Sequence, residues 1–262
     1  MKERLDILLV NNGFTDSREK AKRTIMAGLV TVDGRLEDKP GSRFDTEAEI
    51  IVKGAECPYV SRVGLKLQKA IEEWGVNCED AVCVDMGAST GGFTDCMLQH
   101  GARKVYAVDV GYGQLDYRLR TDSRVVNMEK TNIRYMDTSL IEEPVDLISI
   151  DVSFISVKHM LPVAAAVLAE DGMILCLVKP QFEAGREQVG KGGIVRDPAV
   201  HKEVIRNVIG YAADNGLYPQ QLTWSPIKGT KGNIEYLLLL SRKKCDNDIG
   251  VDELVRQSHD SL

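Results

Sequence analysis

Four charged residues that lie far apart in the chain are expected to meet at one point of the fold: Lys66, Asp151, Lys179 and Glu235. Asp151 and Lys179 each end an apolar strand, and Glu235 opens one, while Lys66 lies on the helix before the first strand of the main sheet. In a wound α/β sheet the parallel strands bring their carboxyl ends to one edge, where ligands bind. An antiparallel last strand would bring its start to the same edge. Two lysines and two carboxylates there suit the removal of a proton from a weakly acidic hydroxyl group.

The elements that must position these residues follow from an alternation of apolar strands and helices after residue 63. Strands are predicted at 81–86, 104–109, 124–128, 145–151, 172–179, 220–225 and 234–240, and helices at 62–75, 91–100, 155–169 and 198–215. Apolar strands interleaved with helices favour a mostly parallel sheet that is covered on both faces. The predicted fold class is therefore α/β and Rossmann-like, with a seven-stranded, mostly parallel sheet and an antiparallel last strand.

A smaller α+β unit is predicted at residues 1–57. Its signals are a helical face from Leu5 to Asn12 that Gly13 ends, a helix at 18–27 that Ser17 caps, a hairpin turn at Asp33-Gly34 and a short strand at 49–53. So short a unit has a marginal core, which favours an accessory module. Residues 58–62 are predicted as a linker, 63–244 as the main domain, and 245–262 as a polar, loosely ordered tail.

Composition narrows the classes of function. The chain has 262 residues, 44% of them hydrophobic, and a net charge of −6, so it is not a basic nucleic-acid binder as a whole, although a local basic face is allowed. The six cysteines lack C-x-x-C spacing and the four histidines lack ligand spacing, which favours reduced thiols and no metal site. The N-terminus has no apolar signal core, and the longest apolar run is about half of the ~20 residues of a membrane span. We expect a cytoplasmic protein without a membrane segment.

A glycine-rich turn between a strand and a helix predicts a cofactor loop in the segment 82–95. Its run from Gly87, G-A-S-T-G-G, lacks the second glycine of the nicotinamide fingerprint G-x-G-x-x-G. It fits better an adenosine without a pyrophosphate, and S-adenosylmethionine is the obvious candidate. Asp109, which ends the next strand, could accept both hydroxyls of a ribose. The candidate cofactor residues are Asp85, Gly87, Ala88, Ser89, Thr90, Gly91, Gly92, Phe93 and Asp109.

A second glycine-rich segment, 185–192, nearly matches a phosphate-binding P-loop. Gly192 stands where Ser or Thr should bind magnesium, and the flanking strand and helix do not fit. Residues 181–197 are instead predicted as a mobile loop beside the site.

Several motifs together resemble a known family. They are the loop G-A-S-T-G-G-F-T-D, V-D-V-G-Y-G-Q-L at Asp109, S-I-D-V-S-F-I-S at Asp151, L-V-K-P-Q-F-E at Lys179 and G-N-I-E-Y-L at Glu235. This series resembles the TlyA family, often labelled hemolysin A, which is similar to the FtsJ-type 2′-O-ribose methyltransferases. The opening unit, with R-L-D from Arg4, S-R-E-K-A-K-R from Ser17 and G-L-V-T-V-D-G from Gly28, resembles an S4 RNA-binding domain.

The resemblance implies a class I S-adenosylmethionine-dependent methyltransferase that methylates the 2′-hydroxyl of cytidine in ribosomal RNA of the large subunit, the small subunit or both. It also implies a catalytic Lys-Asp-Lys-Glu tetrad, carried here by Lys66, Asp151, Lys179 and Glu235, with Lys69 as an alternative to Lys66. A ribose 2′-hydroxyl is a weak acid, and Lys179 is the best candidate to deprotonate or orient it. Which lysine acts as the base stays open.

Basic residues that could contact RNA fall into two groups. Arg4, Arg18, Lys20, Lys22 and Arg23 crowd the two helices of the first unit, and Arg62, Lys228 and Lys231 could add contacts near the pocket. Such phosphate contacts supply affinity and salt dependence but little sequence choice. The expected partners are ribosomal RNA or ribosomal subunits. Residues 57–60, directly before the helix of Lys66, are expected to position that lysine and the cofactor loop when RNA binds.

Three rival functions are weighed against this one. A membrane-active hemolysin lacks a long apolar segment or a strongly amphipathic basic helix. A non-catalytic RNA-binding or ribosome-assembly factor would not need the charged tetrad and the cofactor loop. An amine methyltransferase would need an Asn/Asp-Pro-Pro-Tyr/Phe motif where the chain has D-V-S-F from Asp151. The target nucleotide, the form of the substrate and the oligomeric state stay open.

Overall fold

The computed structural model describes residues 2–12, 14, 15, 17–46, 48–52, 57–229, 232–245 and 249–261. The chain divides into two compact parts, residues 1–58 and 59–262, called here the N-terminal unit and the C-terminal unit. None of the helices formed by these described residues is long and apolar enough to cross a membrane.

The N-terminal unit combines two helices with two small sheets. Its elements are β1 (Lys2–Arg4), α1 (Leu5–Asn11), α2 (Arg18–Met26), β2 (Val30–Val32), β3 (Arg35–Glu37), β4 (Arg43–Asp45) and β5 (Ile50–Val52). β1 pairs with β4, and β2 lies between β3 and β5 in an antiparallel sheet. The predicted cap is present, because the Ser17 side chain accepts the backbone N–H of Lys20. The predicted hairpin turn is present too, since Asp33 and Gly34 both have positive φ.

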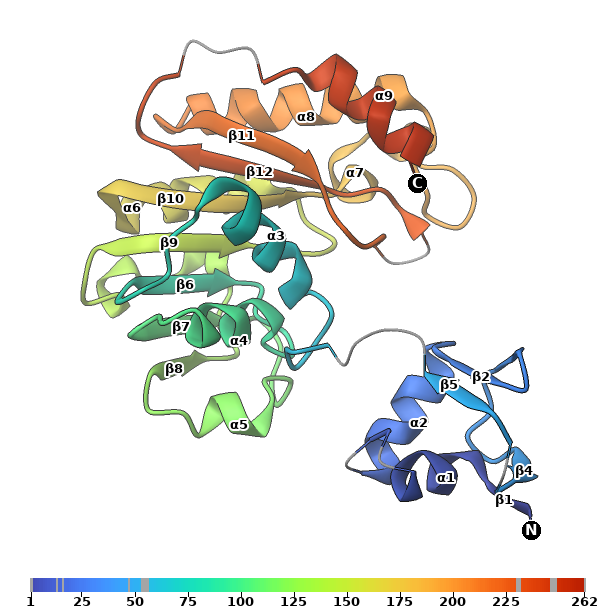
Figure 1. Cartoon of the computed structure of the whole chain (residues 1–262). Helices are drawn as coiled ribbons and strands as arrows, with labels where there is room; N and C mark the ends of the chain where they lie inside the picture. The colour runs from blue at the N-terminus through green and yellow to red at the C-terminus, as the bar shows by residue number, and fades with distance from the viewer. Residues whose placement is uncertain are drawn as a thin grey trace. The chain divides into compact units, whose positions relative to one another are not determined.

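The C-terminal unit is built on one seven-stranded sheet (Figure 1). Its strands are β6 (Val82–Met86), β7 (Lys104–Val108), β8 (Val125–Met128), β9 (Val145–Ile150), β10 (Leu168–Val178), β11 (Tyr218–Trp224) and β12 (Tyr236–Ser241), in the order β11-β12-β10-β9-β6-β7-β8. β12 alone runs in the direction opposite to the other six strands, and it lies between β10 and β11. The predicted fold class is therefore confirmed.

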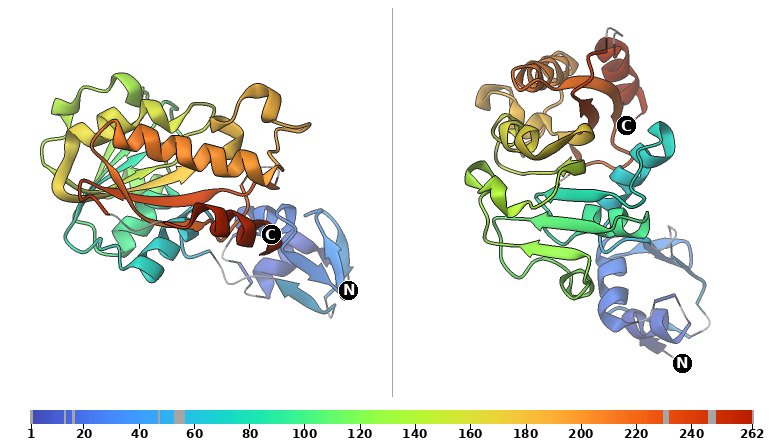
Figure 2. Two further views of the ribbon diagram at one scale, coloured as in Figure 1. Left: turned by 90° about the horizontal axis from the view of Figure 1, so that it is seen from above. Right: turned by 90° about the vertical axis from the view of Figure 1, so that its left-hand side faces the viewer.

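Helices cover both faces of this sheet. They are α3 (Gly64–Trp74), α4 (Gly92–Gln99), α5 (Tyr117–Arg120), α6 (Leu161–Val167), α7 (Pro180–Glu183), α8 (Pro198–Ala213) and α9 (Val251–Ser261), with 3₁₀ turns at Ile133–Tyr135, Thr138–Leu140, Val157–His159 and Arg186–Gln188. Seen from above, α6 and α8 lie on one face and α3 and α4 on the other (Figure 2). Local signals set the ends of the helices. The side chain of Asp197 caps α8 directly before Pro198, and Gly75 ends α3 in the left-handed conformation.

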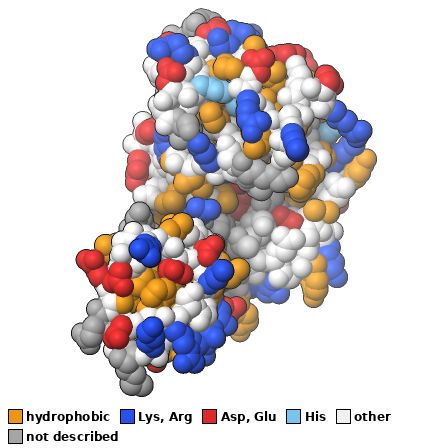
Figure 3. All heavy atoms as spheres, turned by 90° about the vertical axis from the view of Figure 1, so that its right-hand side faces the viewer, with side chains coloured by type: hydrophobic (Ala, Val, Ile, Leu, Met, Phe, Trp, Pro, Cys, Tyr) orange, Lys and Arg blue, Asp and Glu red, His pale blue; other side chains and the backbone are white. Residues whose placement is uncertain are grey.

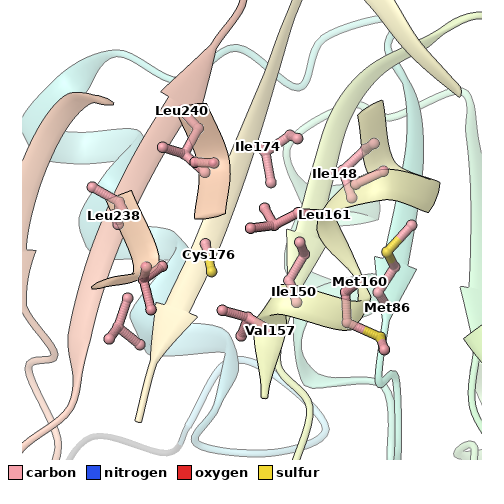
Figure 4. Close-up of a cluster of buried hydrophobic side chains, with 14 of the residues drawn as sticks. Met86, Ile148, Ile150, Val157, Met160, Leu161, Ile174, Cys176, Leu238 and Leu240 are labelled. Carbon is pink, nitrogen blue, oxygen red and sulfur yellow. The ribbon is translucent and has the colours of Figure 1, made fainter. Parts of the chain in front are cut away.

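The core between the sheet and α6 is formed by alternate strand residues. The side chains that face α6 include Ile148 and Ile150 of β9 and Ile174 and Cys176 of β10, and they pack in one cluster with Leu161 of that helix (Figure 4). All of these side chains are fully buried. Burial of one such side chain contributes about 1.5–3 kcal/mol. This packing fixes the register of the strands and so the positions of the residues that follow their carboxyl ends.

Two predicted elements of the C-terminal unit are wrong in extent. The helix predicted at 155–169 is a 3₁₀ turn followed by α6, and β10 begins at Leu168, which has extended backbone angles. The tail predicted as loosely ordered from residue 245 contains α9. Val251 and Val255 of that helix are buried in the same core as α8. Its polar composition hid two apolar positions four residues apart, which is the spacing of a helix with one buried face.

Residues 59–62, which the sequence assigns to a linker, belong to the C-terminal unit. Tyr59 is buried, and the N–H of Val60 donates to the carboxylate of Asp95 in α4. The loop predicted as mobile, 181–197, contains α7, a 3₁₀ turn and a bridge between Gly190 and Ile194. All six cysteines are free, in agreement with the prediction of reduced thiols.

Candidate active site

Two of the four charged residues lie where neighbouring strands end, and a third lies where the next strand begins. β9 ends at Ile150 and β10 at Val178, so Asp151 and Lys179 follow them directly. In the antiparallel pair, Val178 lies opposite Tyr236, the first residue of β12. The next pair in that register would be Lys179 and Glu235. The antiparallel direction of β12 is therefore what brings Glu235 to the carboxyl edge of the parallel strands.

The four side chains form two ion pairs at this edge. Lys179 pairs with Asp151, and the Nζ atom of Lys66 lies 2.7 Å from Oε2 of Glu235. Lys66 and Glu235 are 4% and 3% exposed, so this second pair is shielded from water and should be screened little by salt. Lys69, the alternative to Lys66, instead donates to the carbonyl of Trp224 at 3.0 Å. Lys66, and not Lys69, therefore joins the cluster.

Further contacts fix each ion pair. Lys179 also donates to the carbonyl oxygen of Val152 at 3.0 Å and to the hydroxyl of Ser153 at 3.1 Å. These two hydrogen bonds and the ion pair with Asp151 together hold the ammonium group of Lys179. Gln181, two residues beyond Lys179, donates to Oε1 of Glu235 at 3.0 Å. Through Gln181, the short helix α7 connects the two pairs.

The glycine-rich loop after β6 lies directly beside the end of β9. Gly87 has φ +92°, and a Cβ atom there would lie 2.5 Å from the carbonyl oxygen of Asp151. Only glycine fits so close to that backbone. Gly91 has φ +95°, and a Cβ there would lie 2.2 Å from the side chain of Leu119. These two positions explain why the loop needs its glycines, whatever it binds.

Asp85, on the strand before this loop, bonds to the helix that follows it. Its carboxylate is fully buried and accepts three hydrogen bonds: from the backbone N–H and hydroxyl of Thr94, and from the hydroxyl of Ser149. Burial raises the pKa of Asp85 to about 6, although these hydrogen bonds oppose the shift. Phe93 is also buried, with 2% exposure. Asp85 and Phe93 are thus both buried, so their predicted part in cofactor binding, which stays a prediction, would be to support the loop.

Asp109 and the exposed part of the loop could hold an adenosine. The carboxylate of Asp109 accepts the backbone N–H of Ser89 at 2.9 Å and that of Gly111 at 2.6 Å. Ser89 and Thr90 are exposed, and Asp109 is partly exposed. Val110, directly after Asp109, is 73% exposed and offers an apolar surface. A partly exposed carboxylate beside an apolar surface suits a ribose and its base. Sequence reasoning missed Val110, because a lone valine at a strand end carries no signal.

The segment before α3 packs against the start of α4. A Cβ on Gly64 would lie 2.5 Å from the ring of Tyr59 and 2.8 Å from the carbonyl oxygen of Gly92. A Cβ on Gly92 would lie 2.3 Å from the hydroxyl oxygen of Ser61. This close approach places the helix of Lys66 and the glycine-rich loop in one rigid contact.

Phe154 is a second residue that sequence reasoning missed. It lies three residues beyond Asp151, has φ +65°, and is 91% exposed. Its ring contacts that of Phe182 with a centroid distance of 5.0 Å. A left-handed backbone is rare for an aromatic residue, and it commonly marks a functional constraint. The motif D-V-S-F-I-S gives no sign that its phenylalanine faces water.

The predicted RNA-binding residues occupy both units. Lys22 and Arg23 are exposed on α2, while Arg4 and Arg18 both bind the buried carboxylate of Asp6, at 2.9 and 3.0 Å. Hydrogen bonds from Arg4 are the main cause that lowers the pKa of Asp6 to about 2. Figure 3 shows a group of Lys and Arg side chains at the lower edge of the N-terminal unit in that view.

The remaining predicted RNA contacts divide into described and undescribed positions. Lys20 of α2 is partly exposed, and Arg62 and Lys228 of the C-terminal unit are exposed. Lys231 lies outside the described residues. Within the described part of the chain, no group of three or more His, Cys, Asp or Glu side chains could hold a metal ion.

Comparisons with known proteins agree with this arrangement. The model of the FtsJ-like methyltransferases matches residues 59–242, and that of the S4 domain matches residues 3–50. YqxC of Bacillus subtilis, a proposed rRNA methyltransferase, is 52% identical over 240 residues, which cover 91% of this chain and 85% of that protein. The 16S/23S rRNA (cytidine-2′-O)-methyltransferase TlyA of Mycobacterium tuberculosis is 40% identical over 260 residues, 99% of this chain and 97% of that one.

A solved structure extends the likeness to three dimensions. It is that of a proposed hemolysin from Streptococcus thermophilus, with a TM-score of 0.79 and 47% identity over 99% of this chain and 96% of that one. The methyltransferase match covers most of the C-terminal unit, and the relatives match along nearly their whole length. The chain therefore belongs to the TlyA family of FtsJ-like methyltransferases, with an S4 domain before the methyltransferase domain.

Proposed function

We propose that this protein transfers a methyl group from S-adenosylmethionine to the 2′-hydroxyl of a cytidine in ribosomal RNA. The observation that carries the proposal is the pair of ion pairs, Lys179 with Asp151 and Lys66 with Glu235, at the sheet edge beside the glycine-rich loop. A TlyA relative with this specificity matches nearly the whole chain. An rRNA substrate would place the protein in the cytoplasm.

The residues at the edge have the chemistry that a ribose hydroxyl needs. A 2′-hydroxyl is a weak acid, so its oxygen must be oriented and relieved of its proton as it attacks. Lys179 is held by two hydrogen bonds and by its ion pair with Asp151, all to one loop, which fixes the position of its nitrogen in the cluster. It could orient the hydroxyl as an ammonium donor, or accept its proton after giving up one of its own. Positioned proton transfer contributes about 10²–10⁴-fold in rate.

The Lys66–Glu235 pair would set the charge around that step. Both side chains are buried, and Glu235 also accepts from Gln181. A cation next to Lys179 favours its neutral form, while nearby carboxylates favour the charged form. The pair therefore adds no net charge near the reacting oxygen and holds the wall of the site in place. Positioning of this kind should supply much of the rate of an in-line displacement.

The residues of the cofactor loop fit an adenosine-containing methyl donor. The carboxylate of Asp109 would accept the ribose hydroxyls, Val110 would face the base, and the backbone from Gly87 to Gly92 would line the rest. When bound, S-adenosylmethionine supplies an electrophilic methyl group on a sulfonium centre. The S4 domain and the basic residues of α2 would bring the RNA backbone to the protein.

The experiment that tests the proposal supplies radiolabelled S-adenosylmethionine and unmodified ribosomal subunits to the wild-type protein and to Lys179→Ala. We expect label on a cytidine ribose and a loss of rate of about 10²-fold or more in the variant. Lys66→Ala should lose activity, whereas Lys69→Ala, its matched control outside the cluster, should retain it. Label on a base amine would discard the ribose chemistry. Cofactor binding without label on any rRNA would favour a non-catalytic RNA-binding or assembly factor.

The name hemolysin A, borne by a relative from Brachyspira hyodysenteriae that is 44% identical, raises a membrane-active alternative. Nothing in the arrangement of the charged cluster and the glycine-rich loop calls for a lipid partner. Leakage of a dye from liposomes by the pure protein would support that alternative, and intact liposomes would count against it.

A further inference from the structure

The loop that follows β9, residues 151–157, contacts Lys179 and the helix after it, α7, at several points. At its first half, Lys179 pairs with Asp151 and donates to the carbonyl of Val152 and the hydroxyl of Ser153. These contacts run from the residue before α7 to the start of the loop. They do not reach its second half, where the chain enters the 3₁₀ turn Val157–His159.

The last residue of α7, Glu183, holds that second half. The hydroxyl of Ser156 donates to its Oε2 atom at 2.6 Å, and the backbone N–H of Val157 donates to its Oε1 atom at 2.8 Å. Both carboxylate oxygens therefore bind the same short segment. Charge-assisted hydrogen bonds such as these are about twice as strong as neutral ones.

The carboxylate of Glu183 is withdrawn from water where it binds this segment. Its side chain is partly buried, and burial raises its pKa, while the hydrogen bonds from Ser156 and Val157 oppose the shift. A carboxylate that is withdrawn from water must be compensated by the donors that it binds. Val157, one of the two donors, is buried in the core, so the contact ties the loop to a fixed point.

Between the two attachments lies the exposed residue Phe154. Its ring contacts Phe182, the neighbour of Glu183. The loop from Asp151 to Val157 is thus held at its start by Lys179, in its middle by Phe182 and at its end by Glu183. Loss of one end would free the left-handed turn at Phe154 to relax and would shift the acceptors of Lys179.

We propose that Glu183 is a positioning residue for methyl transfer, which fixes the loop that presents Asp151 and the Val152 carbonyl to Lys179. This inference rests on the proposed function for its effect on the rate. The hydrogen bonds of Glu183 go to Ser156 and Val157 and not to the four tetrad residues, so it would act only through the loop.

The test compares Glu183→Ala with Glu183→Gln in the full-length protein. An amide carbonyl can still accept the N–H of Val157, and its N–H₂ can donate to the Ser156 hydroxyl. We expect kcat of the alanine variant to fall about 10- to 100-fold, while kcat of the glutamine variant stays within about threefold of wild type. Dissociation constants and binding stoichiometry for S-adenosylmethionine should change little in both. A general loss of folding would instead lower that stoichiometry.

Three further variants sharpen the test. Ser156→Ala should lower kcat less than Glu183→Ala, because it removes only one of the two hydrogen bonds to Glu183. The double variant should be no slower than Glu183→Ala, because that substitution already removes the contact with Ser156. Glu187→Ala, an exposed glutamate in the next turn, serves as the control and should behave as wild type. A kcat for Glu183→Ala within about twofold of wild type, or an equal loss in the glutamine variant, would overturn the inference.

Hydrogen exchange separates this inference from the proposed function. The amides of residues 152–157 should exchange faster in Glu183→Ala than in the wild-type and glutamine proteins. Unchanged exchange would sink the positioning role, whatever the protein methylates. If the wild-type protein methylated no ribosomal RNA, the proposed function would fail, while exchange would still decide whether Glu183 holds the loop.

Discussion

Asp85 makes the stability of the C-terminal unit depend on pH. Burial raises its pKa from 3.8 to about 6, so the folded protein holds this proton more tightly than the unfolded chain does. The contribution of Asp85 to stability is therefore greatest below about pH 4, declines as pH rises, and levels off above about pH 6. A shift of about 2 pKa units corresponds to about 3 kcal/mol.

Asp85→Asn should remove this pH dependence. The amide keeps an acceptor for Thr94 and cannot ionise, so unfolding by denaturant should show a gain in stability relative to wild type that grows between pH 4 and pH 6. Asp171→Asn, which changes an exposed carboxyl paired with Lys243, is the control and should show no such gain. If the free energy of unfolding changed with pH in the same way for wild type and Asp85→Asn, ionisation of the Asp85 carboxyl would not destabilise the folded protein.

Substitution of Phe154 should affect stability and RNA binding in opposite directions. Its left-handed backbone costs about 1–2 kcal/mol, and its ring, which contacts Phe182 but is 91% exposed, could stack on a base of the RNA. Phe154→Gly should therefore raise the melting temperature while it weakens RNA binding by about 1–3 kcal/mol in a filter-binding assay. Phe154→Tyr should retain binding. Leu140→Ala, which removes an exposed side chain shortly before β9 begins, should leave binding unchanged.

The meeting of the charged strand ends could be predicted from the sequence, whereas the pairing of the four side chains could not. Asp151 and Lys179 follow strands that are mostly apolar, and the rule that the carboxyl ends of parallel strands share one edge needs no coordinates. That Lys66 rather than Lys69 reaches Glu235 depends on how α3 is rotated about its axis, which a local pattern of residues does not define. The exposure of Phe154 was hidden for a related reason, since its turn is imposed by contacts with α7.

At the scale of elements, the contact between residues 59–64 and α4 links the helix of Lys66 to the glycine-rich loop. Asp95 joins the two by accepting the N–H of Val60 at 2.7 Å and the side chain of Gln99 at 2.9 Å. Asp95→Ala would leave the N–H of Val60 without this acceptor, which costs about 1–3 kcal/mol. We expect part of that cost to appear as a 5- to 10-fold (about 1–1.4 kcal/mol) weaker affinity for S-adenosylmethionine in calorimetry.

Two controls isolate the contact with Val60. Gln99→Ala removes only the other partner of Asp95 and should leave cofactor affinity unchanged. Asp95→Asn keeps an acceptor and should bind almost as wild type does. If Asp95→Ala bound the cofactor normally and turned over at the normal rate, residues 59–64 would have no part in shaping the loop.

The elements that the sequence missed were those whose stability comes from partners distant in the chain. α8 has a capping residue and a proline at its start, so its beginning was predictable from local chemistry. α9 has too few apolar residues to stand out and is stabilised by α8 and the end of the sheet. β10 extends back to Leu168 because it pairs with β9, where Leu168 lies opposite Val145. Neither partner is visible in the local sequence.

For the whole molecule, the proposed function requires that an acidic chain bind a polyanion. The net charge of −6 opposes binding at long range, so affinity must come from local groups of basic residues. In the N-terminal unit, Asp6 holds Arg4 and Arg18 side by side from beneath. The family resemblance predicted the S4 domain. The pairing of Asp6 with both arginines could not be predicted from the pattern of charges, because the sequence does not show which basic residues an acidic residue contacts.

Salt dependence measures how much of the RNA affinity comes from α2. Lys22 and Arg23 are exposed on this helix, away from its buried residues Ala21 and Ile25. If each contacts one phosphate, the double variant Lys22→Ala/Arg23→Ala should reduce the slope of log K against log salt by about 1.4–1.8. Affinity for S-adenosylmethionine should be unchanged. Arg35→Ala, an exposed basic residue on β3, is the control. An unchanged slope in the double variant would mean that Lys22 and Arg23 do not contact phosphates and that RNA is held by other residues.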